Sequence, residues 1–458
     1  MDERNDRKEL PASELLLMIE SRDYQGFRRL VDNFAAADIA ELFDGLPGEV
    51  CVPFYRLLPK EVAAEVFVEM DADLKMQLIN SFTDTELSAV LDELYLDDTV
   101  DMIEEMPAAV VKRILRNSKA EDRASINKLL NYPKDSAGTL MTTEYVRFTK
   151  DMTVERALSH VRRVAIDSET IYTCYVTDAS RRLIGIVTAK DLLTSPLEKT
   201  LSELMEDSVV YAVTTEDREE VVAKFDKYGF LALPVVDNEM RLVGIITVDD
   251  AIGVMREETE EDFAKMAAIT PAETPYLKTG AFSLFRSRIP WLLLLMITAT
   301  FSSAILSKFE TALPTVLLLF VPMLMDTGGN CGGQSSVTVI RAISIGEAKL
   351  SDWRRILLKE FLVGAGCGIT LAAVGFVKIM LVDRLLMNNT EVTLYVALCV
   401  ASALFLSVVS AKLVGSSLPM IAKRIGLDPA VMASPFITTV VDILALLLYF
   451  LISAVILP

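Results

Sequence analysis

Five long apolar stretches in the C-terminal part of the chain constrain its fold more than any other feature. They cover approximately residues 289–307, 312–340, 357–382, 392–420 and 430–457. A helix crosses the hydrocarbon core of a bilayer with about 20 mainly apolar residues, and every stretch is close to or above that length. Charged residues crowd the first 270 positions and thin out afterwards. We therefore predict a soluble N-terminal half joined to five membrane-spanning helices in a lipid bilayer.

The charges between the spans predict their orientation. Basic residues gather between the second and third stretches and between the fourth and fifth, namely Arg341, Lys349, Arg354, Arg355, Lys359, Lys423 and Arg424. The opposite turns carry only Lys308 and Arg384 near their tips. By the positive-inside rule, the N-terminus lies in the cytoplasm and Pro458 outside. The first ten residues, MDERNDRKEL, lack a signal-peptide core. We expect a multi-pass protein of the inner or plasma membrane.

The last apolar stretch contains one carboxylate, that of Asp442. An ionisable group at that depth costs on the order of 3 kcal/mol or more unless it faces a polar interior, so it marks an ion or substrate path by default. Ser434, Thr438 and Asp442 are spaced four apart and share one helical face. A buried Asp held by a neighbouring helix is the alternative. We favour a cation pore.

The second stretch is unusual for a spanning helix because it contains Pro314, Pro322 and the run DTGGNCGGQ at 326–334. Polar groups in a membrane span are tolerated only against protein or a water-filled cavity. Close helix packing alone also explains the glycines. Polar residues such as Asn330 favour pore lining. Lys412, in the fourth stretch, is expected either to snorkel towards the cytosol or to pair with an acid.

Composition excludes several classes of function. The five cysteines form no CxxC pair and His160 is the single histidine, so a disulfide framework and a zinc site are not expected. The chain has no GxxxxGK and no pairing of a nucleophile with a base, so we predict that it is not an enzyme. A net charge of −19 argues against a nucleic-acid partner and for attraction of cations.

The soluble half contains repeats. LIGIVTAKDLL at 183–193 matches LVGIITVDDAI at 242–252, and each copy follows an apolar strand and precedes a helix. Upstream, over 38–115, turn residues recur roughly every 12 residues, which predicts a small α-solenoid of short helices. The two copies resemble cystathionine-β-synthase (CBS) domains over about 140–255. That resemblance implies an adenine-nucleotide site, with ATP as an optional modulator. Its residues would be Thr188, Asp191, Thr247 and Asp250.

Carboxylates are dense in two places. Asp97, Asp98 and Asp101 lie within about one helical turn, and the segment from Glu216 to Asp262 has fourteen Asp or Glu against five Lys or Arg. Such groups repel one another, and Mg²⁺ or Ca²⁺ relieves the repulsion by binding carboxylate oxygens. Solvated surface acids are the alternative. The acidic segment runs through a probable helix towards the first span, so a sensor and a gate would be covalently joined.

The whole chain resembles the MgtE family of magnesium channels. The most specific matches are TGGNCGGQS at 327–335, IRAISIGE at 340–347 with DWRRILLKE at 352–360, and GLDPAVMASPFITTVVD at 426–442. The resemblance implies a multidomain homodimer with a connecting plug helix at about Ala251 to Ile269. The expected domains are an N-terminal helical regulatory domain at 1–136, tandem α/β CBS domains at 137–253, the plug helix and linker at 254–285, and a five-helix pore at 286–458.

The same resemblance assigns site residues. Asp442 would capture hydrated Mg²⁺, with Thr438, Ser434 and Asn330 lining the pore and Asp428 holding a metal at its cytosolic mouth. Family members place an amide and a small apolar residue where this chain has Ser434 and Thr438. The implied regulatory metal ligands are Asp98, Asp101, Glu216, Asp226, Asp250, Glu258, Glu261 and Asp262. Gly253 falls where an acid would be expected.

Three functions fit these patterns. The first is a Mg²⁺-selective channel closed by intracellular Mg²⁺. The second is a secondary transporter that couples a divalent cation, Mg²⁺, Mn²⁺ or Co²⁺, to Na⁺ or H⁺. The third is a nucleotide-sensing membrane scaffold. Asp442 has no obvious His or Lys relay, which favours the channel, and the polar second span disfavours the scaffold.

Overall fold

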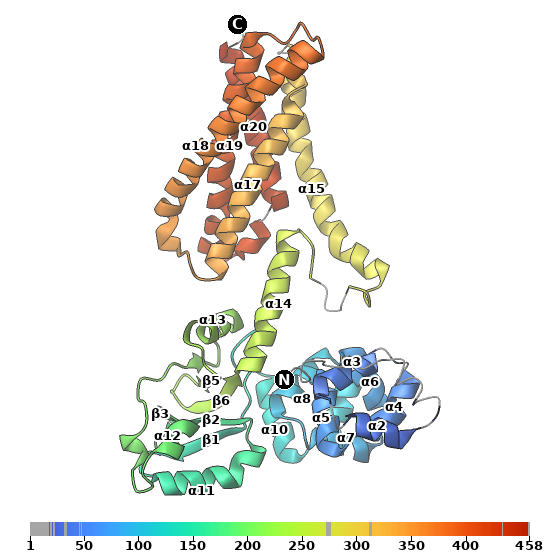
Figure 1. The fold of residues 1–458 in the computed structure, drawn as a ribbon, viewed down its shortest axis with the longest axis vertical. Helices are drawn as coiled ribbons and strands as arrows, with labels where there is room; N and C mark the ends of the chain where they lie inside the picture. Colours follow the sequence, from blue (N-terminus) through green and yellow to red (C-terminus); the bar gives the residue numbers. More distant parts are fainter. Residues whose placement is uncertain are drawn as a thin grey trace, which may run out of the picture. The chain divides into compact units, whose positions relative to one another are not determined.

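The fold is that of a computed structural model, which describes residues 18, 21, 23–31, 34–44, 46, 48–271, 276–310, 314–432 and 434–456. The chain divides into two compact units, Met1–Met255 and Arg256–Pro458. The division falls inside helix α14 (Val248–Met266), which leaves the first unit and enters the second (Figure 1). Each unit is described by itself.

The first unit opens with short helices, as the spacing of turn residues predicts. They are α2 (Tyr24–Val31), α3 (Ala36–Asp44), α4 (Gly48–Tyr55), α5 (Lys60–Glu69), α6 (Ala72–Ser81), α7 (Asp84–Leu91), α8 (Leu96–Glu105), α9 (Ala108–Asn117) and α10 (Ala120–Leu129). Each has 8 to 10 residues because caps interrupt the chain, such as Asp71, which accepts from Leu74 N, and the capping box of Thr83 with Glu86. Their apolar faces form one core with residues such as Phe43 and Phe67.

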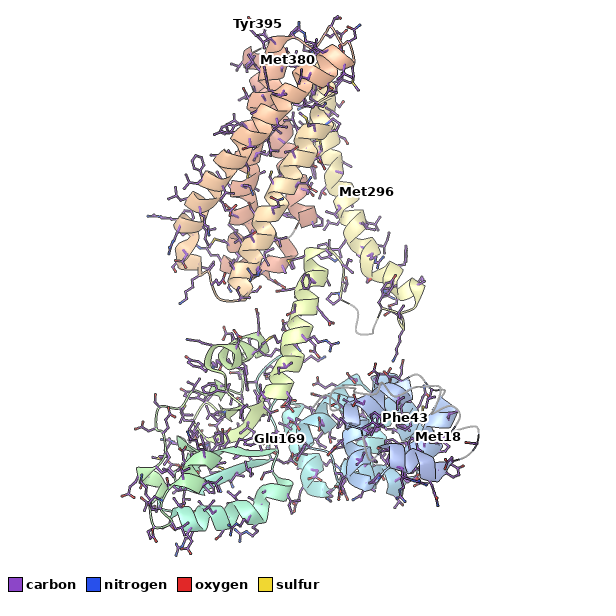
Figure 2. The ribbon with its side chains drawn as sticks, in the orientation of Figure 1. Met18, Phe43, Glu169, Met296, Met380 and Tyr395 are labelled. Carbon is purple, nitrogen blue, oxygen red and sulfur yellow. The ribbon has the colours of Figure 1, made fainter. Side chains whose placement is uncertain are left out.

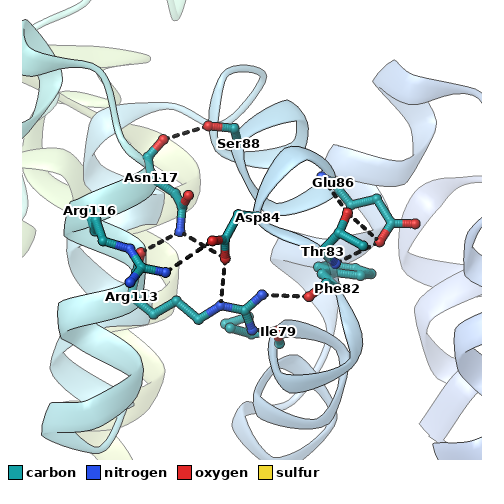
Figure 3. Close-up of polar contacts among 9 residues, drawn as sticks. All are labelled: Ile79, Phe82, Thr83, Asp84, Glu86, Ser88, Arg113, Arg116 and Asn117. Carbon is teal, nitrogen blue, oxygen red and sulfur yellow. Dashed lines mark hydrogen bonds and ion pairs between the residues drawn. The ribbon is translucent and has the colours of Figure 1, made fainter.

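Polar contacts hold neighbouring helices of this array in register (Figure 3). Asp84, in the first turn of α7, accepts from Arg113 Nε at 3.2 Å and pairs with Arg116 Nη2 at 3.0 Å, both from α9. Arg113 also donates to the carbonyl oxygens of Ile79 and Phe82. These bonds satisfy carbonyls at the end of α6, so the array is fixed by specific contacts as well as by its core.

Two three-stranded sheets follow. The first contains β1 (Tyr145–Thr149), β2 (Thr170–Thr177) and β3 (Leu183–Thr188); the second contains β4 (Ala212–Val213), β5 (Ala232–Val236) and β6 (Leu242–Thr247). In both, the first pair of strands is parallel and the second antiparallel. The helices beside them are α11 (Val154–Val164), α12 (Ala189–Thr194), α13 (Arg218–Tyr228) and the start of α14. The predicted internal repeat is confirmed.

The repeated glycine of the two copies has a steric cause. A Cβ on Gly185 would lie 2.7 Å from the Met205 sulfur and 3.0 Å from the Glu206 carbonyl oxygen. A Cβ on Gly244 would lie 2.7 Å from both the Met141 sulfur and the Thr142 carbonyl oxygen. In each repeat, a passing segment therefore lies against the strand where only glycine fits.

The second unit contains five helical segments long and apolar enough to cross a membrane, Ala281–Phe309, Thr315–Ser344, Leu350–Leu386, Leu394–Arg424 and Pro429–Ile456. Their helices are α15 (Ala281–Glu310), α16 (Thr315–Leu318), α17 (Val321–Ser344), α18 (Trp353–Lys378), a π-helical turn (Ile379–Leu386), α19 (Leu394–Arg424) and α20 (Ser434–Ile456). The prediction of five spans is confirmed.

The irregularity expected of the second span lies at Leu319–Phe320, between α16 and α17, and the glycine run itself is helical. Its glycines face other helices: a Cβ on Gly329 would lie 3.0 Å from Thr438, and a Cβ on Gly415 of α19 would collide with the Gly332 carbonyl. The glycines therefore serve close packing, as one of the two interpretations predicted.

Candidate functional site

Three carboxylates from separate parts of the first unit converge. Asp97 lies in the first turn of α8, Glu144 just before β1 and Glu169 just before β2, and one oxygen from each lies within 4.8 Å of the other two. Glu169 lies where the first sheet faces the short helices (Figure 2). Asp97 is only 6% exposed. We call Asp97, Glu144 and Glu169, with the nearby Asp98, Asp101 and Asp250, the acidic cluster.

Backbone bonds hold this convergence in place. Leu96 N donates to Glu144 Oε2 at 3.3 Å, and Glu169 N donates to the Glu144 carbonyl at 2.9 Å. Asp98 N donates to Asp97 Oδ1 at 3.0 Å. Glu169 Oε2, in contrast, is buried without a hydrogen-bond partner among the described residues. A buried carboxylate oxygen with no partner is costly, so a ligand that donates a hydrogen bond or coordinates this oxygen would stabilise the cluster.

The electrostatics agree with that geometry. Burial, followed by repulsion from Asp250, raises the pKa of Asp98 to about 6, of Asp101 to about 7 and of Glu169 to about 8. Burial and the same neighbour also raise the pKa of Asp97 well above its usual value. A divalent cation would lower each of these pKa values and supply the missing positive charge.

The sequence predicted Asp98, Asp101 and Asp250 as ligands and noted Asp97, and the structure brings all four into one cluster. Glu144 and Glu169 were missed. No spacing pattern could have found them, because the parallel pairing of β1 with β2 brings their positions together.

The predicted nucleotide residues are engaged in local hydrogen bonds. Thr188 Oγ1 donates to Asp191 Oδ2 at 2.5 Å in the capping box of α12. Thr247 Oγ1 donates to Asp250 Oδ2 at 2.6 Å at the start of α14. Both signatures therefore fix a strand-to-helix turn, and Asp250 in addition faces the acidic cluster.

The remaining regulatory candidates of the first unit do not join that cluster. Glu216 pairs with Lys224 and accepts from Val213 N at 3.1 Å. Asp226 is exposed on α13.

In the second unit, the end of α14 contacts the last residue of α17 and the segment between α19 and α20. Lys265 Nζ lies 2.6 Å from both Asp428 Oδ2 and Glu261 Oε1, and Ser344 Oγ donates to Asp262 Oδ2 at 3.1 Å. Burial alone would lower the pKa of Lys265, but its bonds to Asp428 and Glu261 raise it. Burial also raises the pKa of Asp262. We call these bonds the α14 docking contact.

Apolar packing supports the same contact. Met266 packs against Ile340 of α17 and against Ala430, two residues after Asp428. Glu258 is half-buried on the preceding turn of α14. Two predicted ligands, Glu261 and Asp428, are thus neutralised by a lysine, which the sequence analysis did not anticipate.

The pore candidates lie on α17 and α20. Asp442 is half-buried, and Thr438 Oγ1 donates to the Pro435 carbonyl at 2.8 Å while its methyl faces Gly329. Asn330 is exposed on α17. The side chain of Ser434 lies outside the described part of the chain.

Lys412 does not snorkel. It is 4% exposed and donates to Ser335 Oγ at 3.3 Å, and Ser335 Oγ donates to Glu360 Oε2 at 2.6 Å. The three residues come from α19, α17 and α18, so this chain of bonds joins three membrane helices and places the lysine near an acid, as one of the two expectations held.

Comparison with known proteins covers nearly the whole chain. Three family models match: a divalent cation transporter domain at 321–452, an MgtE intracellular N domain at 34–135, and CBS domains at 137–198 and 201–257. The chain is 36% identical over 436 residues to the magnesium transporter MgtE of Thermus thermophilus, covering 94% of this chain and 95% of that protein. It is 31% identical over 442 residues to MgtE of Bacillus subtilis, covering 95% of each.

Solved structures resemble the first half of the chain. A crystal structure of the cytosolic domain of the Mg²⁺ channel MgtE in complex with ATP has 37% identity and a TM-score of 0.51, and covers 53% of this chain and 99% of that one. The soluble part of a magnesium transporter has 26% identity and a TM-score of 0.50, with 54% and 97% coverage.

Proposed function

The chain belongs to the MgtE family of magnesium transporters, and from that premise we propose that it is a Mg²⁺-selective channel closed by intracellular Mg²⁺. The relatives are membrane transporters and not enzymes. The observation that carries the proposal is the carboxylate of Asp442, inside a candidate span, with no ion pair or hydrogen bond among the described residues. Such a group in a membrane marks an ion path.

The surface of α17 supports a pore that needs a second copy. Asp326, Asn330 and Gln334 are spaced four apart and are exposed along one side of this membrane helix. Lipid cannot satisfy such groups, so they must face protein or water. A homodimer with α17 and α20 around a wet path meets that need. Mg²⁺ sheds water reluctantly and would pass Asp442 largely hydrated.

The acidic cluster supports the regulation. Without a divalent ion, its carboxylates repel one another; with Mg²⁺ bound, the short helices and the CBS sheets of the first unit are bridged. Asp250 of this cluster lies on the same helix as Lys265 of the α14 docking contact. Ion binding at one end of α14 would bias a two-state gate at the other. Asp226, Glu216 and Glu258 are proposed as weaker sites in the same response.

Orientation and domain extents belong to the same proposal. With the sensor in the cytoplasm, the N-terminus is cytoplasmic and the C-terminus extracytoplasmic, as the basic turns favour. The regulatory domain would span 1–136, the CBS pair 137–253, the plug helix and linker 254–285, and the pore 286–458. Asp428 would bind metal at the cytosolic mouth when Lys265 leaves it.

The ATP complex of the 37% identical cytosolic domain supports adenine nucleotide as a modulator of this chain. The residues proposed to contact it are Thr188, Asp191 and Thr247. Binding requires Thr188 to exchange its bond with Asp191 for one to the ligand. A rise in the unfolding temperature with millimolar ATP would test this by mass action, and its absence in Asp191→Ala would assign the residue.

One observation favours the coupled transporter as second candidate. Lys412, Ser335 and Glu360 form a hydrogen-bonded chain that contains two titratable groups inside the bundle. Such chains can relay protons in carriers.

Ion flux separates the two candidates. Purified protein in vesicles would be assayed for Mg²⁺ uptake with and without imposed proton and Na⁺ gradients, and by single-channel recording with Mg²⁺ on the cytosolic face. A channel gives unitary currents that follow the Mg²⁺ gradient alone and close as cytosolic Mg²⁺ rises. Uptake that stops without a proton or Na⁺ gradient contradicts the channel.

A further inference from the structure

A second carboxylate lies on the proposed ion path. Asp326 is exposed on α17. Asn330 and Gln334 are exposed on the same side of the helix, one and two turns further along. All three lie within the candidate span Thr315–Ser344. An exposed carboxylate followed by two amides along one side of a membrane helix is a row of oxygen atoms suited to cations or to their water shells.

The packing of α17 against α20 gives the depth of Asp326. Gly328 faces Val441 and Ala445, whereas Gly332 faces Ile437 and Val441, so the two helices run antiparallel. Gly329 faces Thr438. Asp326 lies about one turn before Gly329 in α17. Asp442 lies about one turn after Thr438 in α20. A helical turn rises about 5.4 Å in both helices, so the two carboxylates lie at the same level.

The charges of the bundle distinguish these two acids from the others. Glu360 reaches Lys412 through Ser335, and Asp383 pairs with Lys378 at 2.9 Å. In the described part of the chain, neither Asp326 nor Asp442 has an ion pair or a hydrogen bond. Glu360 and Asp383 are thus each connected to a lysine of the bundle. Among the described residues, Asp326 and Asp442 are not, so their charges are available to a mobile cation.

We propose that Asp326 is a second selectivity residue, which together with Asp442 attracts and holds a hydrated divalent cation. This inference rests on the proposed pore. Each copy contributes two carboxylates at one level, which together balance the charge of one divalent ion, and both can accept hydrogen bonds from its coordinated waters. A monovalent ion gains only half of that attraction. Asp326 therefore sets apparent affinity and the preference for divalent over monovalent cations.

The test measures initial Mg²⁺ uptake into vesicles at graded Mg²⁺ concentrations, with Na⁺ as competitor. Asp326→Asn is expected to raise the half-saturating Mg²⁺ concentration about three- to tenfold, with the maximal rate within about twofold of wild type. The difference should shrink at high ionic strength, because salt screens an accessible charge. Asp326→Glu should restore the wild-type value. Glu391→Gln, an exposed acid outside α17 and α20, is the matched control.

The outcomes separate this inference from the pore itself. If Asp442→Asn abolishes uptake while Asp326→Asn keeps wild-type half-saturation and Na⁺ competition, Asp326 is a solvated surface acid and the inference is overturned alone. A fall in maximal rate at unchanged half-saturation, not rescued by Glu, shows a merely structural role and also overturns it. Normal uptake in Asp442→Asn overturns the proposed pore. Gel filtration and thermal unfolding of each variant identify folding defects, in which case Asp326→Ser is assayed in the same way.

Discussion

Carboxylates are handled in opposite ways in the two units. In the first, the six carboxylates of the acidic cluster lie close enough to repel one another, and Glu169 Oε2 is buried with no hydrogen-bond partner among the described residues. In the second, a lysine faces Asp428, another pairs with Asp383, and a third reaches Glu360 through Ser335. Under the proposed function, the acidic cluster of the first unit would bind an external cation, whereas most of these acids in the second unit already lie close to a lysine. This difference is what we expect between a unit that senses an ion and one that conducts it.

The largest effect on ion flux should come from Asp442, an acid of the second unit that has no lysine beside it in the described part of the chain. Asp442→Asn removes the half-buried carboxylate of α20, and we expect Mg²⁺ uptake to fall below about 1% of wild type, because a charge in a low-dielectric path concentrates divalent ions. Uptake into vesicles loaded with a Mg²⁺ indicator measures this. Asp383→Asn, which removes an acid that already has Lys378, is the matched control and should retain most of the flux. An equal loss of Mg²⁺ uptake in both variants would show that an acid paired with lysine matters as much for flux as an unpaired one, and would contradict the comparison.

The next effect concerns the acidic cluster. Neutralising Asp98, Asp101 and Asp250 together removes carboxylate ligands through which Mg²⁺ would bridge the short helices and the CBS sheets, and we expect the cytosolic Mg²⁺ concentration for half-closure to rise about tenfold or more. Currents recorded while Mg²⁺ is raised on the cytosolic face measure this. Neutralising three exposed acids elsewhere in the same unit, Asp151, Glu155 and Glu198, controls for net charge. If the variant closes at the same Mg²⁺ concentration as wild type, the acidic cluster does not take part in gating.

A third effect is a pH dependence of stability that the first unit should show most strongly. Burial raises the folded-state pKa of Asp98, Asp101 and Glu169 to about 6, 7 and 8. Groups with raised pKa values bind protons more tightly when folded, so the Mg²⁺-free protein is most stable near pH 4 and loses stability as the pH rises towards 8. We expect its first unfolding transition to drop by several degrees over this range.

Millimolar Mg²⁺ should restore that transition at pH 8, since the ion replaces the lost protons. Glu169→Gln should show a weaker dependence on both pH and Mg²⁺. Thermal unfolding of the full chain in detergent measures these shifts. A transition that is flat from pH 4 to 8 without Mg²⁺ would mean that the cluster is solvated rather than strained.

The smallest expected effect is an increase in sensitivity to cytosolic Mg²⁺. Gly253 lies on the exposed side of α14, and an added Cβ would meet nothing within 4 Å. Gly253→Asp should therefore fold and add a few tenths of a kcal/mol of helix stability. It also adds an acid where the family resemblance expects one, and we predict closure at about half the wild-type Mg²⁺ concentration. Gly253→Asn, which has nearly the same shape without the charge, should leave the closing concentration unchanged.

Features set by local sequence were predictable. Hydropathy predicts five spans because lipid imposes length and composition on each helix separately, and the repeated glycine motif predicts two related sheets. The plug helix was expected at about Ala251 to Ile269, whereas α14 begins at Val248, directly after Thr247, whose hydroxyl donates to Asp250 Oδ2, and ends at Met266. That offset of three residues is a small error of the local pattern.

Features set by tertiary packing were not predictable. Glu144 and Glu169 enter the acidic cluster through strand pairing, and Lys265 reaches Asp428 across 163 positions of sequence. Neither contact produces a periodic pattern in the sequence from which it could be predicted. The bonds from Lys412 to Ser335 and on to Glu360 likewise depend on how α17, α18 and α19 pack.

Helix α14 has 19 residues and belongs to both units. At about 1.5 Å per residue it is a rod of roughly 28 Å, and intact helices bend little over that length. Mechanically it is a lever arm. A tilt of about 10° at the Asp250 end would move the Lys265 end, about 22 Å away, by about 4 Å, far enough to separate an ammonium from its carboxylate. A small rotation at the carboxylates would thus become a displacement of several ångströms at the lysine.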